Sequence, residues 1–435
     1  MARLSGWWTG DNIITVLASQ KILHGSLDIY AYTWAENAAP PHGFGYSYSP
    51  LVAIIVAPFV RLAEIVGWGP LGTYRVMAIP LMIMDVLAMA QLRWLARSWR
   101  PAVDERILFF GIGLALFATS FLYATGFAGK AEGMVLLFLL LTLRLLPRNL
   151  LLAGLCAGLA LATKHQTALL GLIPLGLVLL AGGRHLVNNP AGRVSLASSK
   201  LLLRGLRDAV VWGSTALAVF AVFMVPAILA NPQAAYYAFI VMPQRLIFLG
   251  PGGLRWADEL AEVLLPTGQY EQVRSVLQYQ LVSLPLVLVL LVTGAIIWAA
   301  WRQRRPISLV DTRLIGLLAL APILLIVSNK WVDHHYFQVP LVLLFLWDLL
   351  RIAPTTTGTV ATLASFPWFG LGSALLYGSL RQIDWQTFNS GDEIRADWLG
   401  YFMIFLMFVG LSVVIVVRLV SDRQPREASD VQPVE

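Results

Sequence analysis

Charged residues and cysteine are both scarce in this chain. Only 13% of its 435 residues are charged, while 58% are hydrophobic. A soluble domain usually carries ~25% charged residues, so the composition excludes an ordinary soluble protein. Cys156 is the only cysteine, which excludes a disulfide within the chain. Residues 1–10 are too short to hold the apolar core of a secretory signal peptide.

The chain is rich in apolar sequence. Runs long enough to cross a bilayer of ~30 Å recur along nearly the whole length, and they are continuous rather than alternating, which excludes a membrane β-barrel. The sequence therefore predicts an all-α fold, a polytopic membrane helical bundle of about 11 transmembrane helices. We place the spans at 75–96, 106–126, 130–146, 149–163, 167–181, 208–230, 280–301, 313–328, 336–353, 359–380 and 398–420.

One further apolar run, 50–67, is interpreted differently. Arg61 and Glu64 interrupt it, and Gly67, Gly69 and Pro70 follow closely. These features favour an interfacial helix that lies on the membrane instead of crossing it.

The distribution of basic residues predicts the orientation. Eleven crossings put the termini on opposite sides, and one set of connections then collects most of the Lys and Arg, which makes that set cytoplasmic. The net charge of +7 therefore reports orientation and not a nucleic-acid partner. The basic residues of this set are Arg93, Arg97, Arg100, Arg106, Arg144, Arg148, Arg184, Arg193, Lys200, Arg204, Arg207, Arg302, Arg304, Arg305, Arg313, Arg351, Arg418, Arg423 and Arg426.

The same orientation gathers the chemically versatile residues on the outer side. We expect one membrane-embedded domain, 1–420, with a large outer segment at 1–74, a second at 231–279, and a cytoplasmic tail at 421–435. The predicted location is the plasma membrane, in contact with membrane lipids, with the site on the extracytoplasmic face. On or near that face lie Asp11, Asp28, His42, Lys130, Glu132, Lys164, His165, Arg245, Arg255, Asp333, His334 and His335.

Two interpretations of Asp11 stay open. It follows Gly10 at the start of an amphipathic run, so its carboxylate can cap a helix. A single carboxylate on the outer face can also act as the general base that takes a proton from an acceptor hydroxyl. Asp28 is the second candidate for that role, although its sequence context is typical of a turn.

Lys164 and His165 interrupt two short apolar runs. The lysine can extend to the interface without any chemical role. Ionisable groups at membrane depth, however, often mark a substrate site, and a lysine between broken helix ends suits a phosphate. We favour the phosphate site. Lys130 and Glu132 form either a self-neutralising pair or a second set of substrate contacts.

A dense polar cluster occupies 329–336. Adjacent histidines on a helix point ~100° apart, and no spaced third ligand completes a zinc site. We therefore expect no metal and no cofactor, and we expect hydrogen bonds from the histidines to a sugar or phosphate. The candidate substrate-binding residues of this cluster are Asn329, Lys330, Asp333, His334 and His335.

The 231–279 segment alternates apolar and charged groups at roughly helical spacing. This pattern predicts amphipathic helices at the membrane surface. Arg245 and Arg255 are its candidate substrate contacts. The segment serves either as a lid over a lipid-linked substrate or as plain scaffold.

These residues resemble a known family. An acidic residue in the first outer segment, then Gly25 to Tyr30, then Tyr48-Ser49-Pro50-Leu51, resembles the C-superfamily of integral-membrane glycosyltransferases. The pattern is most similar to polyprenyl-phosphomannose-dependent α-mannosyltransferases. The resemblance implies that Asp11 is the catalytic base, that His334 or His335 lies near the donor, and that Lys164 and Tyr48 contact substrate. One departure is that only ten residues precede Asp11, where this family has a transmembrane helix.

What the resemblance implies is an inverting hexosyl transfer, with mannose as the expected sugar. The donor is a polyprenyl-phosphate sugar and the acceptor is a lipid or glycan on the extracytoplasmic face. Two alternatives remain, a polytopic membrane transporter and a lipid-carrier flippase or ligase. Transporters often show repeated halves, and no internal repeat is visible in this sequence.

Overall fold

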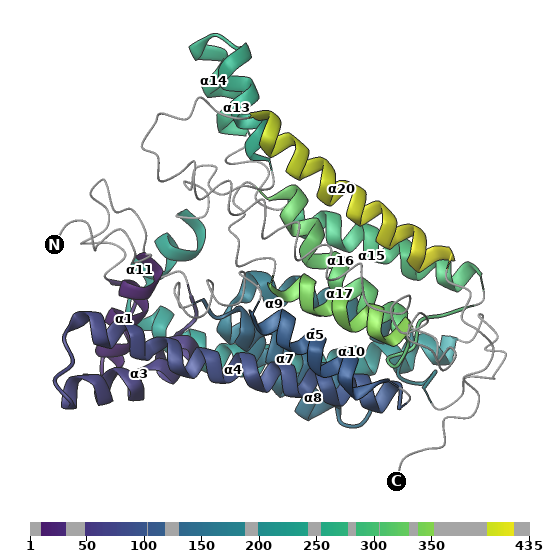
Figure 1. Ribbon diagram of the computed structural model, residues 1–435, viewed down its shortest axis with the longest axis horizontal. Helices are drawn as coiled ribbons and strands as arrows, with labels where there is room; N and C mark the ends of the chain where they lie inside the picture. Colours follow the sequence, from purple (N-terminus) through teal and green to yellow (C-terminus); the bar gives the residue numbers. More distant parts are fainter. Residues whose placement is uncertain are drawn as a thin grey trace.

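Helices form every regular element in the part of the chain that the structure describes (Figure 1). This computed structural model describes residues 10–31, 48–101, 103–117, 130–187, 199–241, 254–276, 284–303, 305–329, 338–351 and 398–421. The first helices are α1 (Gly10–Leu23), α3 (Pro50–Ile65), α4 (Pro70–Trp99), α5 (Glu105–Phe117), α7 (Glu132–Leu145), α8 (Leu150–Thr163), α9 (His165–Leu180) and α10 (Ser199–Ala230). The later ones are α11 (Pro232–Tyr236), the π-helix η3 (Tyr237–Val241), α13 (Arg255–Leu264), α14 (Thr267–Ser275), α15 (Leu284–Arg302), α16 (Thr312–Ser328), α17 (Gln338–Arg351) and α20 (Trp398–Ser421).

Four helices in the described residues are long and apolar enough to cross a membrane. They are the stretches Arg75–Trp99, Lys200–Ala230, Leu284–Arg302 and Phe402–Ser421. The expected all-helical fold is confirmed in the described residues, and these four helices are consistent with the expected membrane protein. Every predicted span coincides at least in part with a helix except 359–380, which lies outside the described residues together with most of the tail.

Side chains next to the helix ends explain where several helices begin. The Asn149 side chain accepts hydrogen bonds from the backbone N–H groups of Leu151 (3.0 Å) and Leu152 (3.1 Å) and thereby caps α8. Asp311 caps α16 by accepting from the N–H of Arg313 at 2.8 Å. After the end of α1, Gly25 adopts a φ of 77°, a left-handed conformation that glycine reaches without strain.

Glycines allow α10 to approach its neighbours closely. A Cβ atom built on Gly158 of α8 would lie 2.6 Å from the carbonyl oxygen of Ala216. One built on Gly205 of α10 would lie 2.5 Å from the carbonyl oxygen of Leu180 in α9. Such close backbone approach is typical of helix packing in membranes. No hydrophobic effect drives helices together there, and small residues allow close van der Waals contact instead.

Helices α7 to α10 run between two chemically different ends of the bundle. We call one the junction end, defined by Tyr48, Glu132 and Lys164. We call the other the arginine end, where Arg144 donates to the Gln91 side chain at 2.9 Å and Arg184 donates to the Pro147 carbonyl at 3.4 Å. The short elements α1, α3 and α11 gather towards the junction end, at the left of Figure 1.

Helix α3 is confirmed as a helix separate from α4. It packs against α1 and α4, and the Gln20 side chain donates to Glu64 at 3.0 Å. That hydrogen bond lowers the pKa of the Glu64 carboxyl below its ordinary value. The N-terminal helix is thereby tied to the segment that the sequence predicts at the membrane surface.

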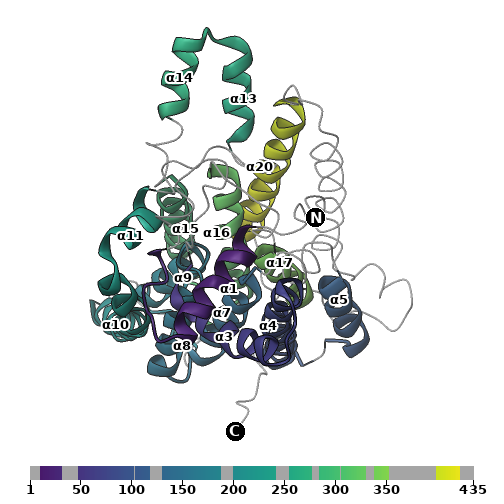
Figure 2. The ribbon, with the colours of Figure 1, turned by 90° about the vertical axis from the view of Figure 1, so that its left-hand side faces the viewer.

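Helices α13 and α14 form a hairpin that projects from the rest of the molecule (Figures 1 and 2). Its attachment is aromatic: the Trp256 ring lies 5.0 Å from that of Phe402 and 5.3 Å from that of Phe405 at the start of α20. Within the hairpin the Tyr270 hydroxyl donates to Asp258 at 3.5 Å. Burial, helped by the nearby Asp258 carboxylate, raises the pKa of Tyr270 to about 12. The helices predicted in 231–279 are therefore present.

Candidate functional site

A single extended residue separates α8 from α9. Lys164 has φ −150° and ψ 92°, so it ends one helix and precedes the next. Its N–H donates to the Ala160 carbonyl at 3.2 Å, and its carbonyl accepts from the N–H of Ala168 at 3.0 Å. The predicted interruption at Lys164 is confirmed, and it places the lysine side chain inside the bundle instead of at a helix surface.

The Lys164 ammonium contacts the Glu132 carboxylate at the first residue of α7. The lysine side chain is 8% exposed and the glutamate side chain is wholly buried. The sequence left open whether Lys130 and Glu132 pair with each other or contact substrate, and the structure shows a contact of Glu132 with Lys164. Residue spacing alone did not show this contact, because the two residues are 32 positions apart and meet through the packing of α7 against α8.

Tyr48 and Ser49 close the site from the start of α3. The Lys164 Nζ lies 5.5 Å from the centroid of the Tyr48 ring, a cation–π distance. The Ser49 hydroxyl donates to the Ala162 carbonyl in the last turn of α8. The segment that holds Tyr48 is thus fixed directly to the helix break, as expected for two parts of one site.

Two more buried ionisable groups belong to this region. Lys130 is 4% exposed and Asp85 of α4 is 5% exposed. A Cβ atom on Gly133 would lie 1.5 Å from Oδ1 of Asp85, so the carboxylate occupies the space that this glycine leaves. Two acids and two lysines therefore lie buried around the start of α7. Charges are buried in an apolar bundle at high cost, which makes such a cluster a functional candidate.

An aromatic group adjoins the helix break. The Phe239 ring stands edge-on to His165 at 5.3 Å and to Tyr30 at 5.1 Å. The Tyr30 hydroxyl donates to the Tyr48 carbonyl at 3.2 Å. Nδ1 of His165 is buried and has no hydrogen-bond partner in the described part of the chain. Segments from α1, α3, α9 and η3 therefore converge on the junction end.

The remaining predicted residues are placed only in part. Asp11 and Arg255 belong to α1 and α13, and their side chains lie outside what the structure describes. The carbonyl of Asn329 accepts from the N–H of Leu254 at 3.0 Å, which joins the end of α16 to the α13–α14 hairpin. Outside the described residues lie Arg245, Lys330, Asp333, His334, His335 and His42.

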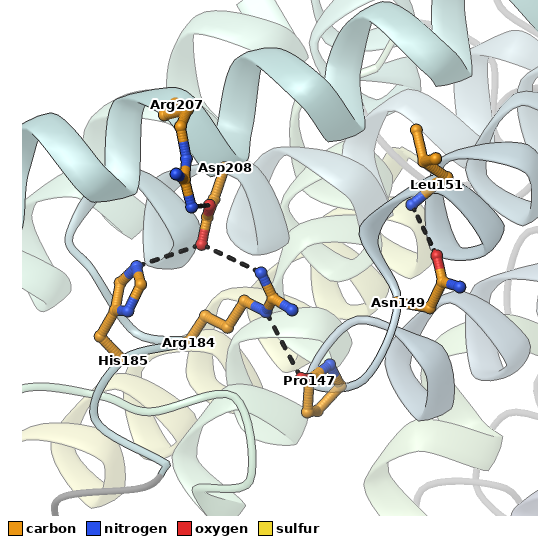
Figure 3. A network of polar contacts seen from close by, with 7 residues as sticks. All are labelled: Pro147, Asn149, Leu151, Arg184, His185, Arg207 and Asp208. Atoms are coloured by element: carbon orange, nitrogen blue, oxygen red, sulfur yellow. Dashed lines mark hydrogen bonds and ion pairs between the residues drawn. The ribbon is translucent and has the colours of Figure 1, made fainter.

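The structure shows a second polar centre that the sequence interpretation did not single out. Asp208 of α10 is fully buried and lies at the arginine end (Figure 3). Its carboxylate meets Arg184 at 3.4 Å, His185 at 3.2 Å and Arg207 at 3.4 Å. An aspartate among basic residues at a span boundary was the available signal, but it is easily taken for an ordinary loop charge.

Comparison with protein-family models, curated proteins and solved structures finds no match for this chain. The fold and its four long apolar helices define the class, a helical protein of the membrane. At one end this bundle buries the Lys164–Glu132 pair at a helix break. This pair is the centre of the candidate functional site.

Proposed function

We propose that this chain is a membrane hexosyltransferase that uses a polyprenyl-phosphate sugar, with mannose as the expected sugar. The observation that carries the proposal is the buried contact of Lys164 with Glu132 at a helix break. The break adjoins Tyr48, and Val16 of α1, the helix that includes Asp11, belongs to the same apolar cluster as Ala162 at the end of α8. A cation held between two helix ends suits a phosphate leaving group.

The proposed chemistry is one displacement at the anomeric carbon. The acceptor hydroxyl oxygen forms a bond to that carbon while the bond to the donor phosphate oxygen breaks, so the configuration inverts. Asp11 takes the hydroxyl proton as general base. Lys164 offsets the negative charge that develops on the departing polyprenyl phosphate, and the electron pair of the broken bond leaves with that phosphate.

The buried carboxylate of Glu132 balances charge in this scheme. While the site holds no phosphate, Glu132 balances the Lys164 charge, which would otherwise be buried alone at high cost. When the donor phosphate arrives, it takes over part of that role. Lys130 and Asp85, buried in the same region, are proposed to keep the cluster close to neutral.

We further propose the finer architecture, with eleven crossings in a C-superfamily-like bundle and the junction end on the extracytoplasmic side. Support comes from the separation of charges. The carboxylate–lysine cluster occupies one end, while Arg93, Arg144 and Arg184 make their contacts at the other. Short basic connections face the cytoplasm in membrane proteins. The α13–α14 hairpin, fixed to α20, is the proposed lid of this outer side.

A transporter is the second candidate, and Asp85 is the observation that favours it. Its buried carboxylate lies well inside α4, beside Gly133, and ionisable groups along a transport path occupy such depths. Uptake of a radiolabelled sugar phosphate into proteoliposomes, without formation of a glycosylated lipid, would select the transporter over the transferase.

The test of the transferase uses a radiolabelled polyprenyl-phosphate mannose and a membrane extract as the acceptor source. The purified protein is expected to move label into a glycolipid or glycan. Asp11→Asn, which removes the base, is expected to lower transfer by ~10²-fold or more. Asp28→Asn, a change of the same kind at the second candidate for the base, is compared in the same assay, and a loss of transfer there but not in Asp11→Asn would move the role to Asp28. Full activity of Asp11→Asn would remove Asp11 from the mechanism.

A further inference from the structure

The arginine end has more cations than carboxylates where α9 and α10 meet. Between residues 181 and 210 the sequence holds one acid, Asp208. Other described arginines meet acids in smaller groups: Arg93 and Arg97 both meet Glu105, and Arg313 meets Asp311. The basic residues of 181–210 are Arg184, His185, Arg193, Lys200, Arg204 and Arg207.

Asp208 holds this group in place without neutralising it. Its buried carboxylate contacts three basic side chains, and Arg184 is fixed a second time through Nε to the Pro147 carbonyl at 3.4 Å (Figure 3). Arg207 is 71% exposed although one of its Nη atoms faces Asp208. The result is an arranged set of guanidinium groups with donors left over for an anion.

An apolar helix face continues directly from these cations. Leu203, Arg207 and Val210 follow one another at helical spacing on α10, and all three are exposed. Further along the same helix, Leu217 and Val225 are exposed on the same face and continue the strip. This helix is one of the four that are apolar enough to cross a membrane. The basic group suits the phosphate of a phospholipid, and the apolar strip that continues from it suits the acyl chains.

We propose that the group formed by Arg184, His185, Arg207 and Asp208 is a binding site for an anionic glycerophospholipid. The lipid phosphate accepts hydrogen bonds from Arg184 and Arg207, and its acyl chains lie along the exposed face of α10. Guanidinium groups suit phosphate because they donate in a fixed planar geometry. Basic sites between transmembrane helices on the cytoplasmic side bind such headgroups.

The lipid would also bridge parts of three helices at this end. Arg184 follows α9, Pro147 precedes α8, and Arg207 belongs to α10. A headgroup on these side chains therefore links three helices, two of which border the Lys164 break at their opposite ends. The site is distinct from the junction end, so the proposal rests on the proposed cytoplasmic placement of the arginine end but not on the transferase activity.

Native mass spectrometry of the purified protein titrated with dioleoyl-phosphatidylglycerol or dioleoyl-phosphatidylcholine tests the site. The unaltered protein is expected to bind phosphatidylglycerol more tightly. Arg207→Gln should weaken that binding about fivefold, the weight of one arginine near a membrane surface, and Arg207→Lys should recover most of it. Because Arg207 is exposed and Asp208 keeps two other partners, the variant is expected to fold.

Arg302→Gln is the matched control. Arg302 ends α15 with its guanidinium 4.3 Å from the Trp298 ring centroid, whereas the described ion pairs of Asp208 are with Arg184, His185 and Arg207. Its removal should leave the affinity for phosphatidylglycerol unchanged. Equal losses in Arg207→Gln and Arg302→Gln would mean general attraction of an anionic surface and would overturn the proposal. Equal affinity for the two lipids would overturn it as well. Free inorganic phosphate, added in competition, should not displace the lipid.

Discussion

The ammonium group of Lys164 contacts the carboxylate of Glu132, and both side chains are buried at one end of an apolar bundle. The lysine stands in the break between α8 and α9, while the glutamate begins α7. Taking two charges out of water is costly, and their mutual attraction recovers only part of that cost. The pair is therefore weakly explained by stability alone, which is why we assign it a function.

Breaking this pair from one side should be far worse than removing both charges. Glu132→Gln or Lys164→Met leaves one charge of the buried cluster uncompensated and is expected to destabilise the protein by about 3–5 kcal/mol. The double variant Glu132→Leu with Lys164→Met should recover most of that loss. Denaturation in detergent measures all three. Additive losses in the double variant would contradict the coupling of the two side chains.

Helix packing gives a prediction from glycine. Gly158→Ala places a methyl group 2.6 Å from the Ala216 carbonyl oxygen of α10, and overpacking of this kind costs about 1–3 kcal/mol. Gly213→Ala is the matched control within α10, because a Cβ there meets nothing within 4 Å. It should be neutral or slightly stabilising. Thermal unfolding in detergent compares them, and similar midpoints would contradict the close α8–α10 contact.

Asp208 is expected to be the main anchor of the arginine end. Asp208→Asn leaves Arg184 without its buried partner and should cost about 3–5 kcal/mol. Arg207→Gln removes an exposed contact and should change stability little. The unfolding free energies of the two variants, measured in detergent, show whether Asp208 is the main anchor. A mild effect of Asp208→Asn would show that Arg184 is held chiefly through Pro147.

Tyr270 gives a prediction in alkaline solution. Burial, and next the Asp258 carboxylate, raises its pKa to about 12. A raised pKa in the folded state means stability that is complete below pH ~10, the unfolded value, and that falls as pH rises towards 12. Tyr270→Phe should remove this fall between pH 10 and 12, and a difference absorbance titration should lose a late-titrating phenol. Loss of an early-titrating phenol would contradict it.

Much of the helical architecture could be predicted from sequence, because apolar runs and their punctuation are local properties. Asn149 and Asp311 cap helices whose starts were expected nearby, and Pro50 begins the helix predicted over 50–67. The break at Lys164 was visible for the same reason, since a lysine between two apolar runs interrupts their pattern.

The partners of buried charges could not be predicted in this way. Glu132 meets Lys164, 32 residues further along the chain, because the packing of α7 against α8 brings it to the α8–α9 break. Asp208 was not singled out from the sequence, and it is fully buried against the basic side chains of Arg184, His185 and Arg207. Such pairings depend on which helix faces meet, and a single sequence does not encode that as a local pattern.

The central claim is that Lys164 balances the charge of a phosphate leaving group. The most direct test is mannosyl transfer from radiolabelled polyprenyl-phosphate mannose by the Glu132→Leu, Lys164→Met double variant, once its folding has been verified. The account predicts a folded protein with transfer lowered by ~10²-fold or more, the usual weight of a group that stabilises developing charge. Transfer at the level of the unaltered protein would contradict it.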